Sequence, residues 1–367
     1  MHPLNRNSIF PGTFSTQSVP ASIISGMELS LITRVDEWRS LEPEWNQLVA
    51  GTFRPYPFLE FWYLHTWWET LGGGEWSQED SELQIVSARQ NNRLVGVAPL
   101  FSSSKPGAQS ALRFIGQVEV TDYLDFICLP GELEVFLRHL LPFLEKEGHN
   151  KTSRMELANF QSDSPAISIL ESLCIENRHS FEKRVLQPSP SIHLPSTWDD
   201  YLGSLSKKQR HEIRRKERNL ERDYTAELVF RQDQPDIEAE MAAFFDLMRN
   251  EEQKARFLTP QTEKFMTTLA TKAQSAGSLN IASLLLEGKQ AAIYLNFIDD
   301  NKLWVYNTGW NPQFASASPG WALLVKLIRW AIEQGLDEVD LMRGGEDYKY
   351  RFGGIDRQVV EVVSERS

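Results

Sequence analysis

Residues 302–353 read KLWVYNTGWNPQFASASPGWALLVKLIRWAIEQGLDEVDLMRGGEDYKYRFG. The pattern predicts a strand over 302–311, a turn, a helix that opens at Gly320, and a short strand over 337–342. The first N–H groups of a helix lack partners, and its N-terminus carries partial positive charge. The helix start therefore suits an anion such as a pyrophosphate.

The start of this helix allows two interpretations. In the first, residues 316–322 cradle a phosphate or pyrophosphate. In the second, Ser318 is an ordinary N-cap and Pro319 occupies the first helical position, where proline is favoured. The turn is only mildly glycine-rich. The residues alone leave both interpretations open.

A polar turn follows the second strand. Gly344 and Gly345 permit backbone conformations closed to other residues and allow a ligand to approach closely. Polar residues then fill positions 346–351. Among them, Tyr348 is suited to donate a proton to a leaving thiolate, and Glu346 to accept one from an amine, directly or through a water. So many titratable groups directly after a buried strand favour a site over a surface.

Two cations of this turn, Arg343 and Lys349, are predicted to hold an anionic group. The alternative is an ordinary surface turn with helical ion pairs, Glu346–Lys349 and Asp347–Arg351. We favour the functional interpretation because the turn follows the central strand of an apolar unit.

Length and composition bound the class of protein. At 367 residues the chain exceeds the size at which single cores stop growing, so two domains or a duplicated one are expected. Cys128 and Cys174 form neither a disulfide framework nor a metal pattern, which fits a reducing, cytoplasmic compartment. The histidines are scattered, so no metal site is predicted. No apolar run reaches the roughly 18 residues of a membrane span. Residues 1–26, polar and rich in serine and proline, are predicted to be a disordered extension.

A formal net charge of −12 argues against wholesale nucleic-acid binding. The predicted helix over 206–222 opposes this balance, because Lys207, Arg210, Arg214 and Arg218 line one of its faces. That face predicts contact with an anion, such as a nucleotide phosphate, a polyanionic acceptor or RNA. The ordinary alternative is a solvated surface. The charge pattern does not choose the anion.

An internal repeat relates the two halves of the chain. Residues 83–101 (LQIVSARQNNRLVGVAPLF) align without a gap with residues 279–297 (LNIASLLLEGKQAAIYLNF). Each predicted hairpin leads to a helix ending in Glu-Gly or Gln-Gly, and then to a short strand. The matching order predicts two mixed α/β modules with helices packed on a sheet, over 27–195 and 196–367.

Two stretches of the first half also attract notice. Asp122, Tyr123 and Asp125 stand at the start of a predicted strand, TDYLDFICL. Their carboxylates either orient an acceptor amine or hydroxyl or only cap the strand. The predicted helix over 57–73 is unusually aromatic, and the helical spacing of its rings favours core over a ligand platform.

Together these motifs resemble a known family. The string MRGGEDYKYRFG, the helix start SPGWALL, the basic SKKQRHEIRRKERNL and the upstream LVGVAPLF and DYLDF are similar to GNAT-type acyltransferases of the BioF2-like, or CelD/BcsL, group. That group is associated by name with cellulose and exopolysaccharide synthesis and is distantly related to the FemABX peptidyltransferases. The resemblance covers about residues 28–360. It implies tandem GNAT-like modules, each a mixed, mostly antiparallel sheet flanked by helices, in agreement with the repeat.

The resemblance also implies a donor site in the second half. GNAT enzymes bind acyl-CoA with its pantetheine along a splayed central strand and its pyrophosphate at the following helix N-terminus. The strand positions here are Val305, Tyr306, Asn307 and Thr308. The helix positions are Ser318, Gly320, Trp321 and Ala322. The tyrosine that protonates the CoA thiolate in many GNATs would be Tyr348.

The expected reaction is acyl transfer from CoA, with acetyl-CoA as the expected donor, to an amine or hydroxyl of a sugar or small metabolite. Attack would be direct, in a ternary complex. Glu346 or Asp340 would assist deprotonation. The sequence SASPGW departs from the common GNAT pyrophosphate signature, which leaves an aminoacyl-tRNA donor, as in the Fem relatives, as an alternative. A third is a catalytically silent binding subunit. The sequence names neither the acceptor nor the oligomeric state.

Overall fold

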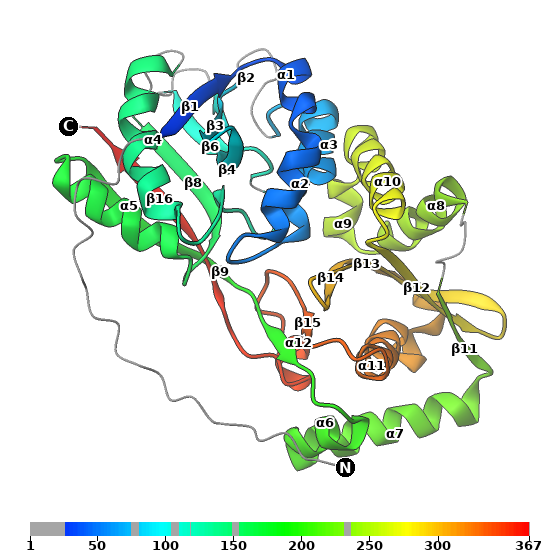
Figure 1. The fold of residues 1–367 in the computed structure, drawn as a ribbon. Helices are drawn as coiled ribbons and strands as arrows, with labels where there is room; N and C mark the ends of the chain where they lie inside the picture. Colours follow the sequence, from blue (N-terminus) through cyan, green and yellow to red (C-terminus); the bar gives the residue numbers. More distant parts are fainter. Residues whose placement is uncertain are drawn as a thin grey trace, which may run out of the picture.

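The computed structural model describes residues 26–74, 81–103, 110–117, 119–148, 154–230 and 236–366. The predicted extension over 1–26 lies outside these ranges except for Gly26. The first half occupies the upper left of Figure 1, in blue to green, and the second half lies to the right and below. None of the helices in the described ranges has the length and hydrophobicity needed to cross a bilayer.

Two sheets carry the first half. One is antiparallel with the order β1-β3-β4-β7, and the other has the order β2-β5-β6-β8-β16-β9. The strand bounds are β1 Met27–Ile32, β2 Ser81–Leu83, β3 Ile85–Gln90, β4 Arg93–Ala98, β5 Leu100–Ser103, β6 Ala111–Phe114, β7 Ile127–Cys128, β8 Arg154–Gln161 and β9 Ser180–Pro188. The strand predicted over 93–101 is interrupted at Pro99, which has no N–H for a ladder, and the chain passes there from one sheet to the other.

One six-stranded sheet, in the order β10-β15-β14-β13-β12-β11, carries the second half. Its neighbours are antiparallel except for β14 and β15, which run parallel. The bounds are β10 Ser191–His193, β11 Ala226–Phe230, β12 Leu279–Leu286, β13 Lys289–Asp299, β14 Lys302–Trp310 and β15 Glu338–Asp340, and the last strand of the chain is β16 Gln358–Glu365.

The internal repeat is confirmed. Each half contains an aligned hairpin, β3–β4 and β12–β13, in which Arg93 and Lys289 open the second strand. In each half a further antiparallel strand follows, β6 in the first and β14 in the second. A long helix comes next, and then a strand that pairs in parallel with that antiparallel strand, β8 with β6 and β15 with β14. The chain is therefore an α/β protein built from two tandem modules, each a mixed sheet flanked by helices.

The two modules exchange strands. β10 continues directly from β9 of the first half and pairs with β15 of the second-half sheet. In return β16 lies between β8 and β9 of the first-half sheet, antiparallel to both. Figure 1 shows β9 and β16 running side by side between the two parts of the molecule. Both sheets thus contain strands from both halves.

Helices cover the sheets, and two apolar cores result. Their bounds are α1 Val35–Ser40, α2 Glu42–Ala50, η1 Pro57–Leu59, α3 Phe61–Leu71, α4 Leu133–Glu147, α5 Pro165–Glu176, α6 Trp198–Ser204, α7 Lys207–Asp223, α8 Ile237–Met248, α9 Glu252–Phe257, α10 Pro260–Ser275, η4 Pro312–Ala317, α11 Pro319–Glu333 and α12 Asp347–Arg351. The larger core joins the first half to α8, α10 and one face of the second-half sheet, whereas α11 covers the other face.

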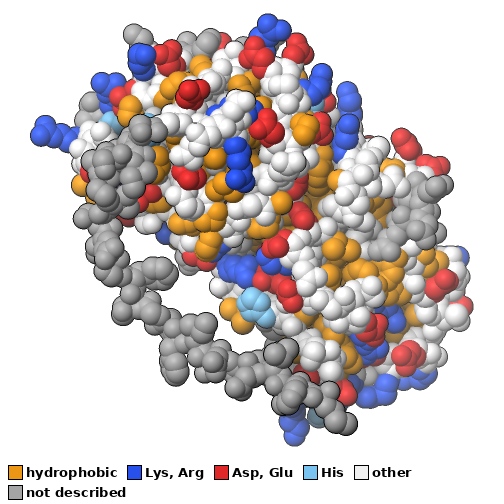
Figure 2. All heavy atoms as spheres, in the orientation of Figure 1, with side chains coloured by type: hydrophobic (Ala, Val, Ile, Leu, Met, Phe, Trp, Pro, Cys, Tyr) orange, Lys and Arg blue, Asp and Glu red, His pale blue; other side chains and the backbone are white. Residues whose placement is uncertain are grey.

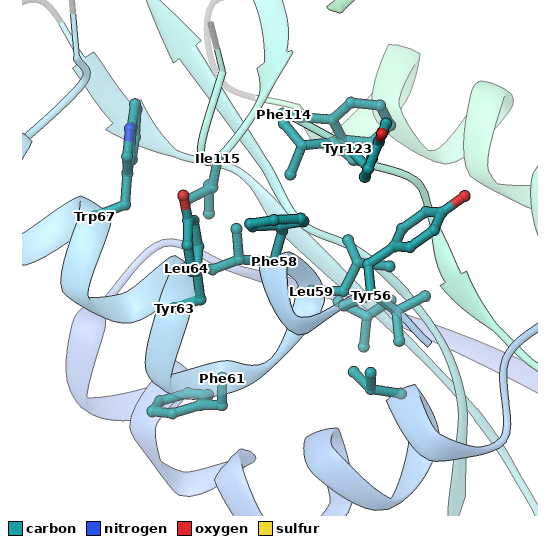
Figure 3. Close-up of a cluster of buried hydrophobic side chains, with 14 of the residues drawn as sticks. Tyr56, Phe58, Leu59, Phe61, Tyr63, Leu64, Trp67, Phe114, Ile115 and Tyr123 are labelled. Carbon is teal, nitrogen blue, oxygen red and sulfur yellow. The ribbon is translucent and has the colours of Figure 1, made fainter. Parts of the chain in front are cut away.

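The aromatic helix α3 is core, as its periodicity predicted. Its residues 61–68 are all buried. Figure 3 shows the rings of Tyr63 and Trp67 on α3 with Phe58 just before it. Tyr123 lies beside Tyr56 there, with ring centroids 5.4 Å apart. The first-half loop that contains Tyr123 is therefore anchored in the larger core.

Three local expectations are corrected. The strand predicted over TDYLDFICL is reduced to β7, and residues 121–126 have no regular structure, because their side chains and backbone bond to other segments instead of a ladder. The turn before α11 forms the 3₁₀ helix η4. Ser318 has left-handed backbone angles (φ 49°) and makes no side-chain capping bond, although Pro319 does occupy the first helical position.

Candidate active site

The two parallel strands of the second half separate at their carboxyl ends. β14 and β15 pair only at Lys302–Glu338, Leu303–Val339 and Trp304–Asp340. Beyond these pairs a cavity of about 360 Å³ opens between the continuing chains. One wall is formed by residues 305–308 and another by residues 341–343. Because the two chains no longer pair across this gap, there is room for a ligand between them.

A β-bulge in β14 sets the direction of the wall formed by residues 305–308. The register against β13 shifts by one residue, because Asn296 pairs with Val305 and its neighbour Leu295 pairs with Asn307. Tyr306 is thus the extra residue of the bulge, which bends the strand at this point. Its hydroxyl donates a 2.8 Å hydrogen bond to the carbonyl of Val120 in the first half. All four predicted strand positions, including Thr308, line the cavity.

The first half supplies a further wall through Glu119, Val120, Asp122 and Gln187. Asp122 does not face the cavity as a free carboxylate. Its Oδ1 accepts a 2.7 Å bond from Arg343 Nε, and its Oδ2 accepts a 3.0 Å bond from the Arg343 backbone N–H. Arg343 also donates to the backbone carbonyl of Glu119. The predicted anion-binding arginine is therefore engaged in joining the two halves.

Lys349, the other predicted anion binder, is engaged as well. Its side chain is 3% exposed, and Nζ lies 2.7–3.2 Å from the carbonyl oxygens of Met342, Arg343 and Gly344. Glu346 Oε2 lies 3.0 Å from the same nitrogen. The three N–H groups of an ammonium are matched by these acceptors, which leaves no donor for an incoming anion.

Asp340 and Tyr123 meet between the modules. Tyr123 Oη donates to Asp340 Oδ1 at 2.8 Å, and the backbone N–H of Met342 donates to the same oxygen at 2.8 Å. Asp340 is fully buried and does not line the cavity. Burial raises the pKa of Asp340 to about 7, against the lowering effect of the Tyr123 hydrogen bond. Tyr123 is completely buried too, and burial raises its pKa.

Tyr348 and Glu346 do line the cavity. They lie at the start of the short helix α12, where Tyr348 is 37% exposed and the Glu346 side chain is 56% exposed. Burial of the phenol, reinforced by Glu346 and Glu251, raises the pKa of Tyr348. The two ion pairs expected of an ordinary turn are also present, at 3.0 Å for Glu346–Lys349 and 3.9 Å for Asp347–Arg351. The turn therefore combines these ion pairs with cavity-lining acid and base candidates.

A second, smaller cavity of about 230 Å³ lies where α7 meets the start of α11. Its lining includes Ser316 and Ser318 beside Arg215 and Lys216 of α7. The Lys216 ammonium lies 4.4 Å from the ring centroid of Trp321, within cation–π range. The predicted helix start and the basic helix therefore form one pocket.

The start of α11 has room for a ligand. A Cβ added at Gly320 would meet nothing within 4 Å. Gly320 and Trp321 occupy positions whose N–H groups have no partner within the helix. The carbonyl of Gly320 accepts a 3.2 Å bond from Tyr294 Oη. Ala322 is buried, and its N–H is already bonded to the carbonyl of Ser318 at 2.9 Å.

The two anion-binding arginines predicted on α7 differ in placement. Arg210 donates to the carbonyls of Leu202, Gly203 and Leu205 and so caps the end of α6. Arg214 is exposed, and in the part of the chain that the structure describes it has no carboxylate within ion-pair distance. Figure 2 shows Lys and Arg side chains along the lower edge, where Figure 1 places α6 and α7.

Sequence reasoning missed several lining residues. Lys254 lines the larger cavity and donates to the carbonyl and hydroxyl of Thr308 at 2.7 and 3.0 Å. Gln187 and Gln253 line it too. Lys254 and Gln253 belong to the short helix α9, and no local sequence signal places this helix near β14. Lys216 belongs to the basic segment recognised in the sequence, but only the packing of α7 against α11 shows that it lines the smaller cavity.

The comparisons place this geometry among known proteins. Residues 207–350 match the family model described as the acetyltransferase (GNAT) domain. The match lies entirely within the second half, which is therefore similar in sequence to GNAT-type acetyltransferase domains. No curated protein matches the sequence. In the described ranges no group of three His, Cys, Asp or Glu side chains is arranged to hold a metal ion.

Solved structures support the fold over nearly the whole chain. A crystal structure of FemX is similar with a TM-score of 0.63 and 13% identity, covering 91% of this chain and 96% of that one. A conserved protein of unknown function from Bacteroides thetaiotaomicron is similar with a TM-score of 0.58 and 14% identity, covering 92% and 100%. At such identities the likeness establishes the fold alone. Both likenesses extend over the two tandem modules, so these structures share the arrangement of the fold.

Proposed function

We propose that the protein transfers an acyl group from acyl-CoA, with acetyl-CoA as the simplest donor, to an amine or hydroxyl of a sugar or small metabolite. The observation that carries this proposal is the separation of β14 from β15 at the Tyr306 bulge, which opens the larger cavity, together with the second cavity at the start of α11. A thioester end and a pyrophosphate end are both accommodated by such an arrangement. Exopolysaccharide or cellulose synthesis in the cytoplasm is the setting that the BioF2-like resemblance suggests.

The donor is assigned to both cavities. Its pantetheine lies along residues 305–308, where bulged backbone faces the gap. Its pyrophosphate lies at the N-terminus of α11, where helix N–H groups favour an anion and Lys216 with Arg215 adds positive charge. Tyr294 supports this assignment, because its hydroxyl bonds the carbonyl of Gly320, and its pKa is raised by burial and by the nearby Tyr348.

The chemistry is direct attack in a ternary complex. Glu346 takes the proton of the attacking amine, directly or through a water. The amine nitrogen bonds to the thioester carbonyl carbon, the C–S bond breaks, and Tyr348 gives its proton to the leaving thiolate. A raised pKa keeps the Tyr348 phenol protonated at neutral pH, as a general acid requires. Of the two carboxylates considered as base, Glu346 is preferred because Asp340 is enclosed behind the turn.

A second candidate keeps the fold and changes the donor to an aminoacyl-tRNA. The basic outer face of α7 favours it, since Arg214 and Arg215 are exposed next to the α11 pocket. The similarity to FemX concerns the fold and does not select this donor. Such binding would weaken steeply with salt and would be lost when the exposed arginines of α7 are neutralised.

Ligand-dependent melting separates these candidates. A protein that binds acyl-CoA must be stabilised by it, and at about 100 times the Kd the gain is about 2.7 kcal/mol. The measurement is a thermal-shift series with acetyl-CoA, longer acyl-CoAs and free CoA. A rise in Tm with acyl-CoA supports the proposal. No shift with any thioester at millimolar concentration would favour the tRNA donor or a catalytically silent GNAT-like subunit.

A further inference from the structure

The turn that follows β15 is held in a conformation its sequence does not favour. Met342 has φ 64°, in the left-handed region that residues with side chains rarely adopt, and Gly344 has φ 115°. A strained backbone persists only where its surroundings over-determine it, and such strain collects at functional sites. Met342 is also part of the cavity wall. The contacts that enforce this turn therefore bear on the site.

One clamp comes from the C-terminal side. Lys349 lies within hydrogen-bond distance of three successive carbonyls, those of residues 342–344, from a position that is 3% exposed. A buried ammonium without partners would be very unfavourable, so these bonds tie the position of the lysine to the shape of the turn. Glu346 and Tyr348 lie between the turn and Lys349 in the chain. Their backbone is consequently bracketed at both ends.

The other clamp comes from the first half. Both oxygens of Asp122 bond to Arg343, one to its side chain and one to its backbone N–H. The backbone N–H of Gly344 bonds at 2.9 Å to the carbonyl of Pro188, the last residue of β9. The turn is thus held from opposite sides by a residue of its own module and by the neighbouring module.

We propose that Lys349 and Asp122 are positioning residues of the acyl-transfer site, which hold the turn over 342–344 and thereby place Glu346 and Tyr348 against the thioester end of the donor. This inference rests on the proposed function. It assigns to Lys349 and Arg343 a task inside the protein in place of anion binding. It also gives the first module a direct part in the geometry of the second module's site.

A selective loss of affinity distinguishes positioning from a merely structural role. Acetyl-CoA reaches the larger cavity with its thioester, whereas adenosine 3′,5′-bisphosphate carries only the nucleotide end and binds beside α11 and α7. A variant that loosens the turn weakens the first ligand and spares the second. A variant that only destabilises the fold weakens both together.

The experiment is calorimetric titration of the full chain with each of these two probes. Lys349→Met should raise the Kd of acetyl-CoA by about tenfold or more while the Kd of adenosine 3′,5′-bisphosphate stays within about twofold. Asp122→Asn, which keeps the shape but removes the charge of a partly exposed side chain, should act in the same direction. Lys264→Met, an exposed lysine of α10, is the matched control and should change neither.

Each outcome decides the matter. If Lys349→Met does not fold, Asp122→Asn carries the comparison. Equal weakening of both probes, or unchanged acetyl-CoA binding in both variants, would overturn the positioning role and leave the proposed function intact. If the wild-type protein binds neither probe, the proposed function fails, and the positioning role fails with it.

Discussion

The hydroxyl of Tyr123 donates a 2.8 Å hydrogen bond to Oδ1 of Asp340, across 217 positions of the chain. One residue belongs to the irregular loop of the first module and the other ends β15, where the two parallel strands separate. The same carboxylate oxygen receives the backbone N–H of Met342. Groups from both modules therefore hold the chain at the point where the cavity wall over residues 341–343 begins.

The general-acid assignment predicts a large effect of Tyr348→Phe. Loss of a positioned proton donor should lower kcat by about a hundredfold or more, because general acid–base groups contribute roughly 10²–10⁴-fold. Acetyl-CoA affinity should change little, since the ring remains. The measurement is thiol release in the presence of an amine acceptor that the wild-type protein acetylates. Transfer within about twofold of wild type would remove Tyr348 from the mechanism.

Because the pKa of Asp340 is raised in the folded protein, we expect the free energy of unfolding to depend on pH with a defined sign. Its folded pKa of about 7 lies above the value of about 3.9 expected in the unfolded chain. Between those values the unfolded state binds fewer protons, so the free energy of unfolding falls as pH rises from about 4 to 7.

Asp340→Asn supplies the test of that sign. The amide cannot ionise, and its oxygen can still accept from Tyr123 and Met342, so the variant should show a smaller fall over the same window. Urea unfolding of both proteins at several pH values measures the difference. Parallel curves would show that Asp340 does not titrate in this window.

We expect Lys216 to make a specific contribution to nucleotide binding. Its ammonium lies in the α11 pocket and over Trp321. Lys216→Met should weaken CoA by roughly tenfold, and the loss should shrink in high salt because the contact is electrostatic. Lys207→Met is a control on the same helix, at an exposed position outside the pocket. Equal effects of the two substitutions would indicate only a general influence of charge.

We expect a side chain at Gly309 to cause a packing defect close to the site. A Cβ at this position in β14 would lie 2.8 Å from Leu247 Cβ and 3.0 Å from the backbone nitrogen of Met248. Gly309→Ala must push α8 away from the sheet, which should cost about 1–3 kcal/mol. Gly203→Ala, where a Cβ meets nothing within 4 Å, is the control for denaturant unfolding. A Gly309→Ala variant as stable as that control would contradict this packing.

The fold was largely predictable because its signals are local. The aligned hairpins at 83–101 and 279–297 carry the alternation and turn residues that fix strand pairing, and the aromatic helix carries its own periodicity. The strand exchange was not predictable in the same way. Nothing local in residues 358–365 indicates that β16 pairs with β8 and β9, because that choice depends on contacts distant in sequence.

The candidate site was predictable in position and less so in role. Residues 305–308 and Tyr348 do line one cavity, because strand ends and the following turn meet at one edge of a sheet. The sequence presents Lys349 and Arg343 only as cations, and charge alone suggests an anion. Their burial against carbonyls and Asp122 is a tertiary property, as is the contribution of Lys254 from α9.

The most direct test is hydrogen–deuterium exchange of the wild-type protein with and without acetyl-CoA. We predict slower exchange in three segments that surround the two cavities: residues 304–310 of β14, residues 316–324 around the start of α11, and residues 341–350 of the turn and α12. Protection confined to other parts of the chain, or no protection at millimolar acetyl-CoA, would contradict this prediction.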